Sequence, residues 1–314
     1  MNFDELKKVK EDIDRNNKKV KKIALTAYCS VAGIGVAILV SCAIIFKTYF
    51  ILSFIFPCLI GPGVITLIAG VIATAVMNKD NNKVIAEYSK AYKGEYVEKY
   101  LKEVFSDVEY HPEAGFSKEY LRKSCNAVLY DRYHSNDYMM GKYKNLNVEF
   151  ADVHIEDKRE DRDSDGNTRT YYVTMFQGKW MVFDFNKNFK YNLIVSGTSH
   201  IMSLQGTHHV KMEDENFNKV YSVHAMSDEE AFYILTPHMM NKMRALYHKL
   251  GDNGITFGFI NNKLYVALNT YKDSFELDLS KGISDEAFKN NVLKDIKEIT
   301  NFIDDLDLDN NLFK

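Results

Sequence analysis

Two long apolar runs near the N-terminus constrain the fold of this chain more than any other feature. Residues 23–46 and residues 50–76 contain no charged side chain, and only residues 47–49 separate them. As helices, runs of 24 and 27 residues would be roughly 36–40 Å long, which exceeds the hydrocarbon core of a bilayer at about 30 Å. The sequence therefore predicts an integral membrane protein in which residues 23–77 form a two-helix transmembrane hairpin.

The second run is less regular than the first, because Pro57 and the Gly61–Gly63 segment would kink a helix there. A kinked spanning helix and a re-entrant element lining a pore are the two alternatives. Transporters and channels usually place charged residues at membrane depth, and neither run contains one. We therefore interpret the hairpin as an anchor.

Basic residues are concentrated next to the predicted hairpin. Residues 1–22 hold eight of them, and Lys18, Lys19, Lys21 and Lys22 lie in the last five positions before the first run. Basic flanks stay in the cytoplasm, so we expect a multi-pass protein of the cell (inner or plasma) membrane with both termini cytoplasmic. The same four lysines are the candidate contacts with the membrane surface.

Charge and cysteine content exclude several classes of function. The net charge is −3, and residues 1–22 contribute +3 and Lys47 +1, which leaves −7 for the rest and argues against nucleic-acid binding. Cys125 is the one cysteine outside the apolar runs, as expected in a reducing cytoplasm. A CxxC pair, a Gly-rich phosphate loop and a GxSxG elbow are all missing from the sequence, so no cofactor is predicted.

The segments beside the hairpin show helical periodicity. Apolar residues in 1–22 recur with heptad spacing, which predicts a basic juxtamembrane helix. Residues 78–132 are expected to form a helical stalk or connector, with an apolar stripe along 82–105. Two alternatives stay open: the segments form a short antiparallel stalk, or the first lies on anionic headgroups.

Residues 133–314 are predicted to form a cytosolic α+β domain with an antiparallel sheet, flanking helices and a C-terminal helix. Short polar loops favour hairpin connections. Apolar residues occur at every second position at Val148 and Phe150 and again at Val153 and Ile155, but the alternation shifts by one residue between the two pairs, which indicates a bulge. Ser227 and the three acidic residues after it are typical of a helix cap. The expected strands are 137–143, 146–157, 170–185, 190–197, 217–225, 255–260 and 263–269, and the expected helices are 117–130, 228–235, 237–249 and 285–306.

Four short segments in this domain combine aromatic, glycine and charged residues in a recognisable way. They are Asp137-Tyr138 with Gly141, FQGKW at 176–180, residues 217–237, and KDSFE at 272–276. In these segments the chain resembles a bacterial family of membrane-anchored proteins classed as domain of unknown function 3137. Gln177 departs from the pattern, since a basic residue is common there. The family implies no established activity, so the resemblance identifies no catalytic residue.

One acidic loop resembles half of a calcium site. Asp161, Asp163 and Asp165 occupy the first, third and fifth positions of such a loop and Gly166 the sixth. The twelfth position, normally a bidentate Glu, is Tyr172. A polar hairpin tip is the preferred interpretation, and the three aspartates are weak candidates for a divalent cation.

Four histidines, His200, His208, His209 and His224, fall within 25 residues. Zinc requires three or four converging ligands, and the sequence has no HExxH motif. We interpret these histidines as solvated loop residues, with a pH-sensitive patch as the alternative hypothesis.

The first functional hypothesis is a membrane-anchored cytosolic binding or scaffold module without catalysis. Its partners would be the bilayer and a protein partner or a second copy. The alternative is an enzyme that uses carboxylate and histidine chemistry on a membrane-associated substrate. Carboxylates that converge on one pocket with histidines would favour the enzyme.

Overall fold

The structure is a computed structural model in which the chain forms two compact units, residues 1–91 and 92–314. The predicted hairpin of residues 23–77 lies almost entirely outside the residues that the structure describes. Among the described residues, no helix is both long and apolar enough to cross a bilayer. Residues 11–19 and 21–23 are helical, as the heptad spacing predicts. The described residues are 8, 11–19, 21–23, 25–26, 29, 33, 89–90, 93–162, 164, 166–185, 188–197, 201–250, 254–276 and 285–308.

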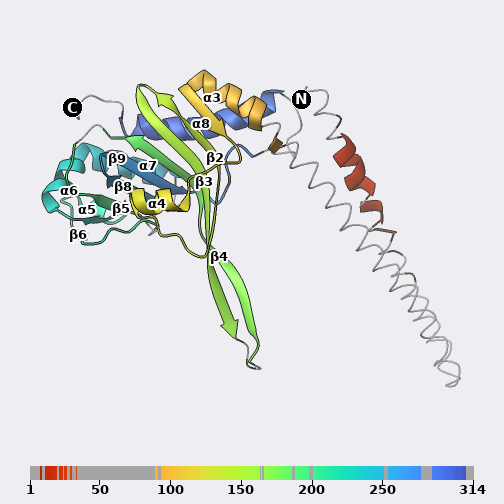
Figure 1. Cartoon of the computed structure of the whole chain (residues 1–314), viewed down its shortest axis with the longest axis horizontal. Coiled ribbons are helices and arrows are strands. Elements are labelled where there is room, and N and C mark those ends of the chain that lie inside the picture. The colour runs from red at the N-terminus through yellow and green to blue at the C-terminus, as the bar shows by residue number, and fades with distance from the viewer. Residues whose placement is uncertain are drawn as a thin grey trace. The chain divides into compact units, whose positions relative to one another are not determined.

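Within the described residues, the second unit is built on a nine-stranded antiparallel sheet in the order β1-β2-β3-β4-β9-β8-β5-β7-β6 (Figure 1). This confirms the predicted α+β class. The strands are β1 (Ser106–His111), β2 (Arg132–Tyr143), β3 (Leu146–Arg162), β4 (Thr168–Asp184), β5 (Leu193–Ser196), β6 (His208–Val210), β7 (Ser222–Ala225), β8 (Ile255–Ile260) and β9 (Lys263–Asn269). The helical elements are η1 (Lys93–Val97), α3 (Glu98–Val104), α4 (Lys118–Cys125), α5 (Glu215–Asn218), α6 (Asp228–Ile234), α7 (Pro237–Leu250) and α8 (Asp285–Asp305).

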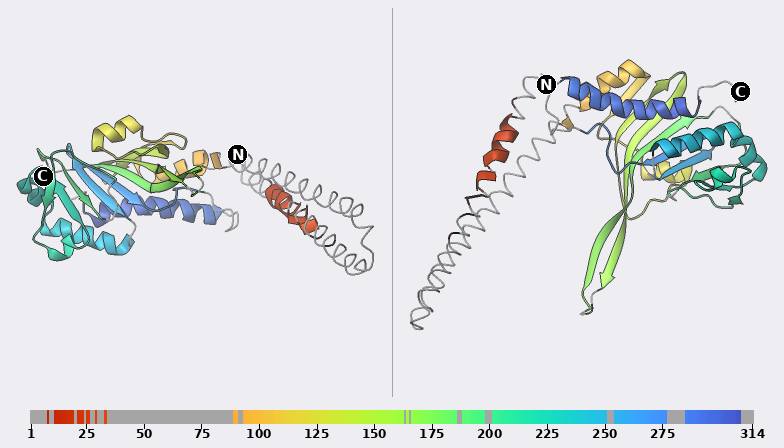
Figure 2. Two further views of the ribbon diagram at one scale, coloured as in Figure 1. Left: turned by 90° about the horizontal axis from the view of Figure 1, so that it is seen from below. Right: turned by 180° about the vertical axis from the view of Figure 1, so that it is seen from behind.

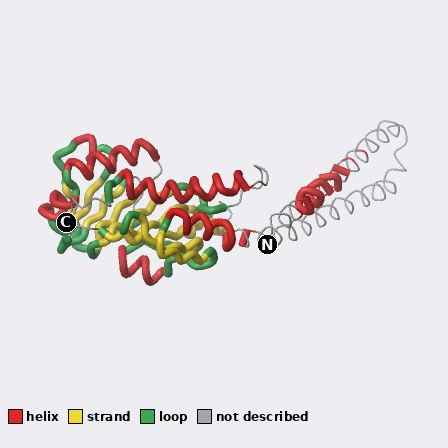
Figure 3. The backbone as a smooth tube through the Cα atoms, turned by 90° about the horizontal axis from the view of Figure 1, so that it is seen from above, coloured by secondary structure: helices red, strands yellow, loops and turns green. Residues whose placement is uncertain are grey.

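Helices cover both faces of the sheet. Figure 2 shows α4 against one face and α7 and α8 against the other, and Figure 3 shows helices on both sides of the strands. The core under α4 includes Ala151, Val153 and Ile155 of β3. On the opposite face, Phe150 of β3 packs edge-on against Phe275. A central strand covered on both faces has apolar residues at odd and even positions, which is why β3 lacks simple alternation.

The prediction of a bulge between Val148 and Ile155 of β3 is therefore wrong. The register of β3 against β4 runs without a break from Val148 to Ile155, so the slipped phase reflects burial on both faces. The irregularities lie elsewhere. Ile155 and Glu156 of β3 pair with Phe176 and Thr174, so the extra residue is Met175 on β4. The other irregularity lies on β2 between Asn136 and Met139. Asp137, inside the β2 irregularity, has a φ of 57°, in the left-handed region.

Other predicted elements are confirmed with shifted limits. Ser227 caps α6 by accepting a hydrogen bond from the Glu230 amide. The expected strand 217–225 is shortened to β7, because Asp214 accepts hydrogen bonds from two following amides and starts α5 there. The segment before Pro112, within the range expected to form a helical stalk or connector, forms the edge strand β1 instead.

The β3–β4 hairpin continues well beyond the rest of the sheet. Pairing of β2 with β3 ends at Glu156, and pairing of β9 with β4 ends at Gly178, whereas β3 and β4 stay paired up to Arg162 and Thr168. Figure 1 shows the result as a two-stranded ribbon that projects from the body. We call residues 157–173 the arm.

Candidate functional site

A buried group of charged side chains is centred on Asp137, whose residue is 0% exposed. One carboxylate oxygen accepts a hydrogen bond from the Tyr110 hydroxyl at 2.6 Å. The other accepts from Lys93 Nζ at 2.7 Å and from Asn136 Nδ2 at 2.7 Å. The left-handed backbone at Asp137 belongs to the irregular segment of β2, where this side chain meets its three donors.

Lys93 links this group to the segment before α8. Its ammonium also contacts Glu276 Oε1 at 2.6 Å. Burial alone would lower the pKa of Lys93, but the carboxylates of Asp137 and Glu276 raise it above its ordinary value. Burial, with Asp137 as a second cause, raises the pKa of Tyr110 far above its usual range. Lys93 is therefore a cation and Tyr110 a neutral donor at physiological pH.

A second buried carboxylate, Asp152 of β3, binds the same segment. It accepts hydrogen bonds from the Ser274 amide and from Ser274 Oγ, the latter at 2.9 Å. Burial raises the pKa of Asp152 to about 8, although the Ser274 amide and the charge of Lys179 act in the opposite direction.

Lys179 completes the network on the α8 side of the sheet. Its ammonium lies 3.2 Å from Asp295 Oδ1 and 2.8 Å from Glu298 Oε2, both on α8. Asp295 in turn accepts a hydrogen bond from the Phe275 amide at 2.8 Å. The network thus attaches residues 273–276 and α8 to the middle of the sheet.

Three of the four segments that carry the family resemblance meet in this network. Asp137 comes from the first, Lys179 from FQGKW, and Ser274 with Glu276 from KDSFE. Gln177 donates a hydrogen bond to Asp273 at 3.3 Å, so a basic residue there would form an ion pair with that aspartate. Each charged group has its partner within the fold, so the network acts as a structural clamp.

The raised pKa of Asp152 predicts a pH-dependent stability. Its folded pKa of about 8 lies above the ordinary value of 3.8, so the folded state holds the proton more tightly. The stabilisation is complete below about pH 4 and is lost as the pH rises to about 8, by at most about 1.4 kcal/mol per pH unit. We expect Asp152→Asn, which cannot titrate, to give a flatter free energy of unfolding between pH 5 and 8.

This prediction can be measured by denaturant unfolding followed through the fluorescence of Trp180, the only tryptophan of the chain and a fully buried residue. Asp107→Asn is the matched control, because the Asp107 side chain is 68% exposed. If the free energy of unfolding changes with pH in the same way for the Asp152→Asn variant and the wild type, the raised pKa of Asp152 is contradicted.

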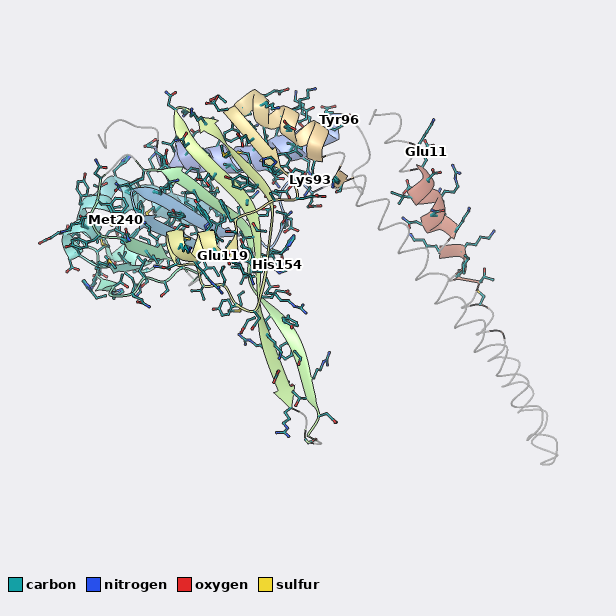
Figure 4. The ribbon with its side chains drawn as sticks, viewed as in Figure 1. Glu11, Lys93, Tyr96, Glu119, His154 and Met240 are labelled. Atoms are coloured by element: carbon teal, nitrogen blue, oxygen red, sulfur yellow. The ribbon has the colours of Figure 1, made fainter. Side chains whose placement is uncertain are left out.

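A separate, open pocket lies where the arm leaves the body, and has a volume of about 370 Å³. Figure 4 labels His154 at this place and Glu119 on the neighbouring helix α4. The pocket is lined by Lys118, Asp131, Arg132, Tyr133, His134, His154 and Glu156.

The pocket combines charges of both signs. Arg132 is 3.8 Å from Glu156 and stacks its guanidinium over the Tyr172 ring of the arm. His134 and His154 are direct partners across β2 and β3, which places two imidazoles on one wall. Lys118 reaches in from α4 above the Tyr133 ring. This arrangement suits a small polar ligand that carries an anionic group, with the acidic residues available to a cationic group.

The predicted calcium-like loop is only partly described. Asp161 lies on the arm, exposed and opposite Arg169 on β4, while Asp163 and Asp165 are outside the described residues. Searching the described part of the chain reveals no group of three or more His, Cys, Asp or Glu residues that could hold a metal ion. The four candidate lysines, Lys18, Lys19, Lys21 and Lys22, are exposed.

Three of the four predicted histidines lie close together at the β6 edge of the sheet. His209 and His224 are cross-strand partners with ring centroids 5.7 Å apart. His208 contacts Asp228 Oδ1 at 2.6 Å, and His200 is outside the described residues. His208 and His209 are exposed, as the interpretation as solvated residues predicts, but they lie on strand β6 and not in a loop, and His224 lies on β7 within the expected strand 217–225.

Sequence reasoning missed the pocket entirely. His134 and His154 are 20 positions apart and become neighbours only through the register of β2 on β3. The one local sign was the polar and aromatic segment DRYH at 131–134, which ends two residues before the first predicted strand, 137–143.

Comparison with known proteins supports the classification but assigns no activity. No curated protein matches the chain. The crystal structure of the mycobacterial trehalose monomycolate transport factor A, TtfA, is similar with a TM-score of 0.36 and 8% sequence identity, over 69% of this chain and 95% of that chain. That likeness is too weak to support an inference about function. Residues 174–308 match the model of the family described as protein of unknown function (DUF3137), which supports the classification predicted from the segments at 176–180, 217–237 and 272–276.

Proposed function

We propose that this protein is a membrane-anchored cytosolic binding module, tethered by a hairpin of residues 23–77, which holds a polar ligand at the membrane surface without transforming it. The pocket at the root of the arm carries this proposal. Its basic groups, Lys118, Arg132 and the two histidines, face a common space of about 370 Å³ beside Asp131 and Glu156. A headgroup-sized molecule with an anionic and a cationic end fits this charge pattern.

The buried network supports the same proposal. A catalytic carboxylate or lysine needs access to a substrate. Asp137, Asp152 and Lys179 are at most 3% exposed and are bound to partners within the fold. These groups stabilise the domain that presents the pocket, and they do not face it. The two uncharged runs and the basic residues beside them support the tether.

The proposal predicts a ligand that depends on the pocket. Full-length protein is purified in mild detergent, and its bound lipids and small molecules are identified by mass spectrometry. The double variant Lys118→Ala/His154→Ala removes one basic group from α4 and one from β3, so we expect at least a tenfold loss of the bound ligand. Unchanged retention would contradict binding in the pocket.

A matched control removes the same two types of residue at positions outside the pocket. Lys123→Ala/His111→Ala removes one lysine from α4 and one histidine from β1, both exposed and neither lining the pocket. This variant is expected to retain the ligand at the wild-type level.

One observation favours an enzyme as the second candidate. His134 and His154 share the pocket with Asp131 and Glu156, so imidazole and carboxylate groups of the kind used in acid–base catalysis do converge. Purified protein incubated with membrane lipids, with and without Mg²⁺, separates the two functions. A new product that disappears with Glu156→Gln would favour the enzyme, whereas unchanged lipids with a retained ligand favour the binding module.

A further inference from the structure

The arm has two outer edges that no other strand of the described chain covers. On β3 the free edge runs from Asp157 to Arg162, and on β4 it runs from Thr168 to Phe176. Every described side chain from Lys158 to Tyr171 is exposed. A two-stranded ribbon without a packed face is only marginally stable in water, and three or more strands are needed for independent stability. The arm therefore lacks the edge pairing that a further strand would supply.

The two edges differ sharply in chemistry. All six residues of the β3 edge are charged, with Lys158 contacting Glu160 and Arg159 contacting Asp157 along the strand. Charged residues of this kind protect an edge from pairing with another chain. The β4 edge, TRTYYVTMF, has Arg169 as its single charge and contains no lysine or proline. Threonine, tyrosine and valine are strong strand formers, so this edge is unprotected.

A second copy of this chain fits the β4 edge. In an antiparallel contact between the same edge of two copies, each residue keeps its face of the sheet, so the register is centred on a residue. Centred on Tyr171, the contact places this tyrosine opposite its own copy and Arg169 opposite Val173. Aromatic cross-strand pairs are favourable, and the lone charge does not face its own copy in this register. The result is a four-stranded sheet, β3-β4-β4-β3, with the protected β3 edges outermost, and a twofold contact of this kind closes at two copies.

We propose that the protein self-associates by strand addition between the arms of two copies, through residues 168–174 of β4. This contact does not rest on the proposed function, although Thr174 at its end lies 3.3 Å from Nε2 of the pocket residue His154. Where the protein is tethered in one membrane, the tether raises the effective concentration of the two arms and favours the contact.

The experiment measures the mass of full-length protein in mild detergent by light scattering. The wild type is expected to be a dimer at micromolar concentration. Thr170→Lys/Thr174→Lys places lysines on exposed positions of the β4 edge, where position 170 of one copy and position 174 of the other are diagonal neighbours on one face, and is expected to weaken dimerisation at least tenfold. The emission of buried Trp180 reports whether this variant is folded.

The matched control is Glu160→Thr/Asp161→Thr, which changes the net charge by the same two units on the β3 edge. It is expected to remain a dimer, and a cysteine at position 171 in a cysteine-free background is expected to cross-link two copies. A monomeric wild type would overturn the proposal, and so would a folded Thr170→Lys/Thr174→Lys variant that still dimerises. If the natural partner of this edge is a strand of another protein, the wild type is expected to be monomeric, which is the first of these outcomes.

Discussion

Lys93→Met is expected to destabilise the second unit by about 3–5 kcal/mol, because it leaves a buried carboxylate without its cation. The Asp137 side chain is 0% exposed, and among its partners in the described part of the chain Lys93, at 2.7 Å, is the one with a positive charge. Glu276 loses the same partner, but its side chain is 51% exposed and water compensates it. Denaturant unfolding followed by Trp180 fluorescence measures the loss.

A comparison with an exposed ion pair makes this prediction specific. Lys142 contacts Asp107 at the same distance of 2.7 Å, but the side chains are 47% and 68% exposed. Lys142→Met is therefore expected to cost less than about 1 kcal/mol. Adding Asp137→Asn to Lys93→Met is expected to recover part of the loss, since it removes the uncompensated charge. Equal effects of Lys93→Met and Lys142→Met would contradict the clamp.

Gly178→Ala is expected to destabilise the protein by about 3 kcal/mol, the upper end of the usual range for an overpacked site. A Cβ atom at this position would lie 2.2 Å from the Leu268 carbonyl oxygen and 2.7 Å from the Thr270 amide nitrogen. Both neighbours are backbone atoms next to the last β4–β9 pair, so they cannot move without breaking that pairing. This close approach explains the glycine of FQGKW.

Gly94→Ala serves as the control, because a Cβ atom there would have no neighbour within 4 Å. Alanine at such a site reduces the entropy of the unfolded chain and is expected to be neutral or slightly stabilising. Thermal unfolding of the two variants in the same detergent gives the comparison. A Gly178→Ala variant as stable as Gly94→Ala would show that β4 and β9 are not packed this closely.

Much of the fold could be predicted from local patterns. Strands β8 and β9 lie at their expected residues because an Asn-Asn turn separates two short apolar runs. The C-terminal helix α8 follows its apolar periodicity to within one residue of the predicted end. By contrast, burial on both faces of β3 depends on helices from distant parts of the chain, so its slipped phase was mistaken for a bulge.

The candidate site was beyond prediction for the same physical reason. The clamp joins residues separated by up to 183 positions, as Lys93 and Glu276 show. The sequence did mark three of the contributing segments through the family resemblance, although it did not indicate that they meet. The pocket required the register of β2 on β3, and a one-residue shift would send His134 and His154 to opposite faces.

Photo-cross-linking in living cells tests the central claim most directly. A photoreactive phenylalanine analogue replaces Tyr133, which lines the pocket, in the full-length protein, and the adduct is identified by mass spectrometry. The control position is Tyr271, which is 61% exposed and outside the pocket. A binding module predicts a defined small-molecule or lipid adduct at position 133 that Lys118→Ala/His154→Ala removes. The same adducts at positions 133 and 271, or none at position 133, would contradict the account.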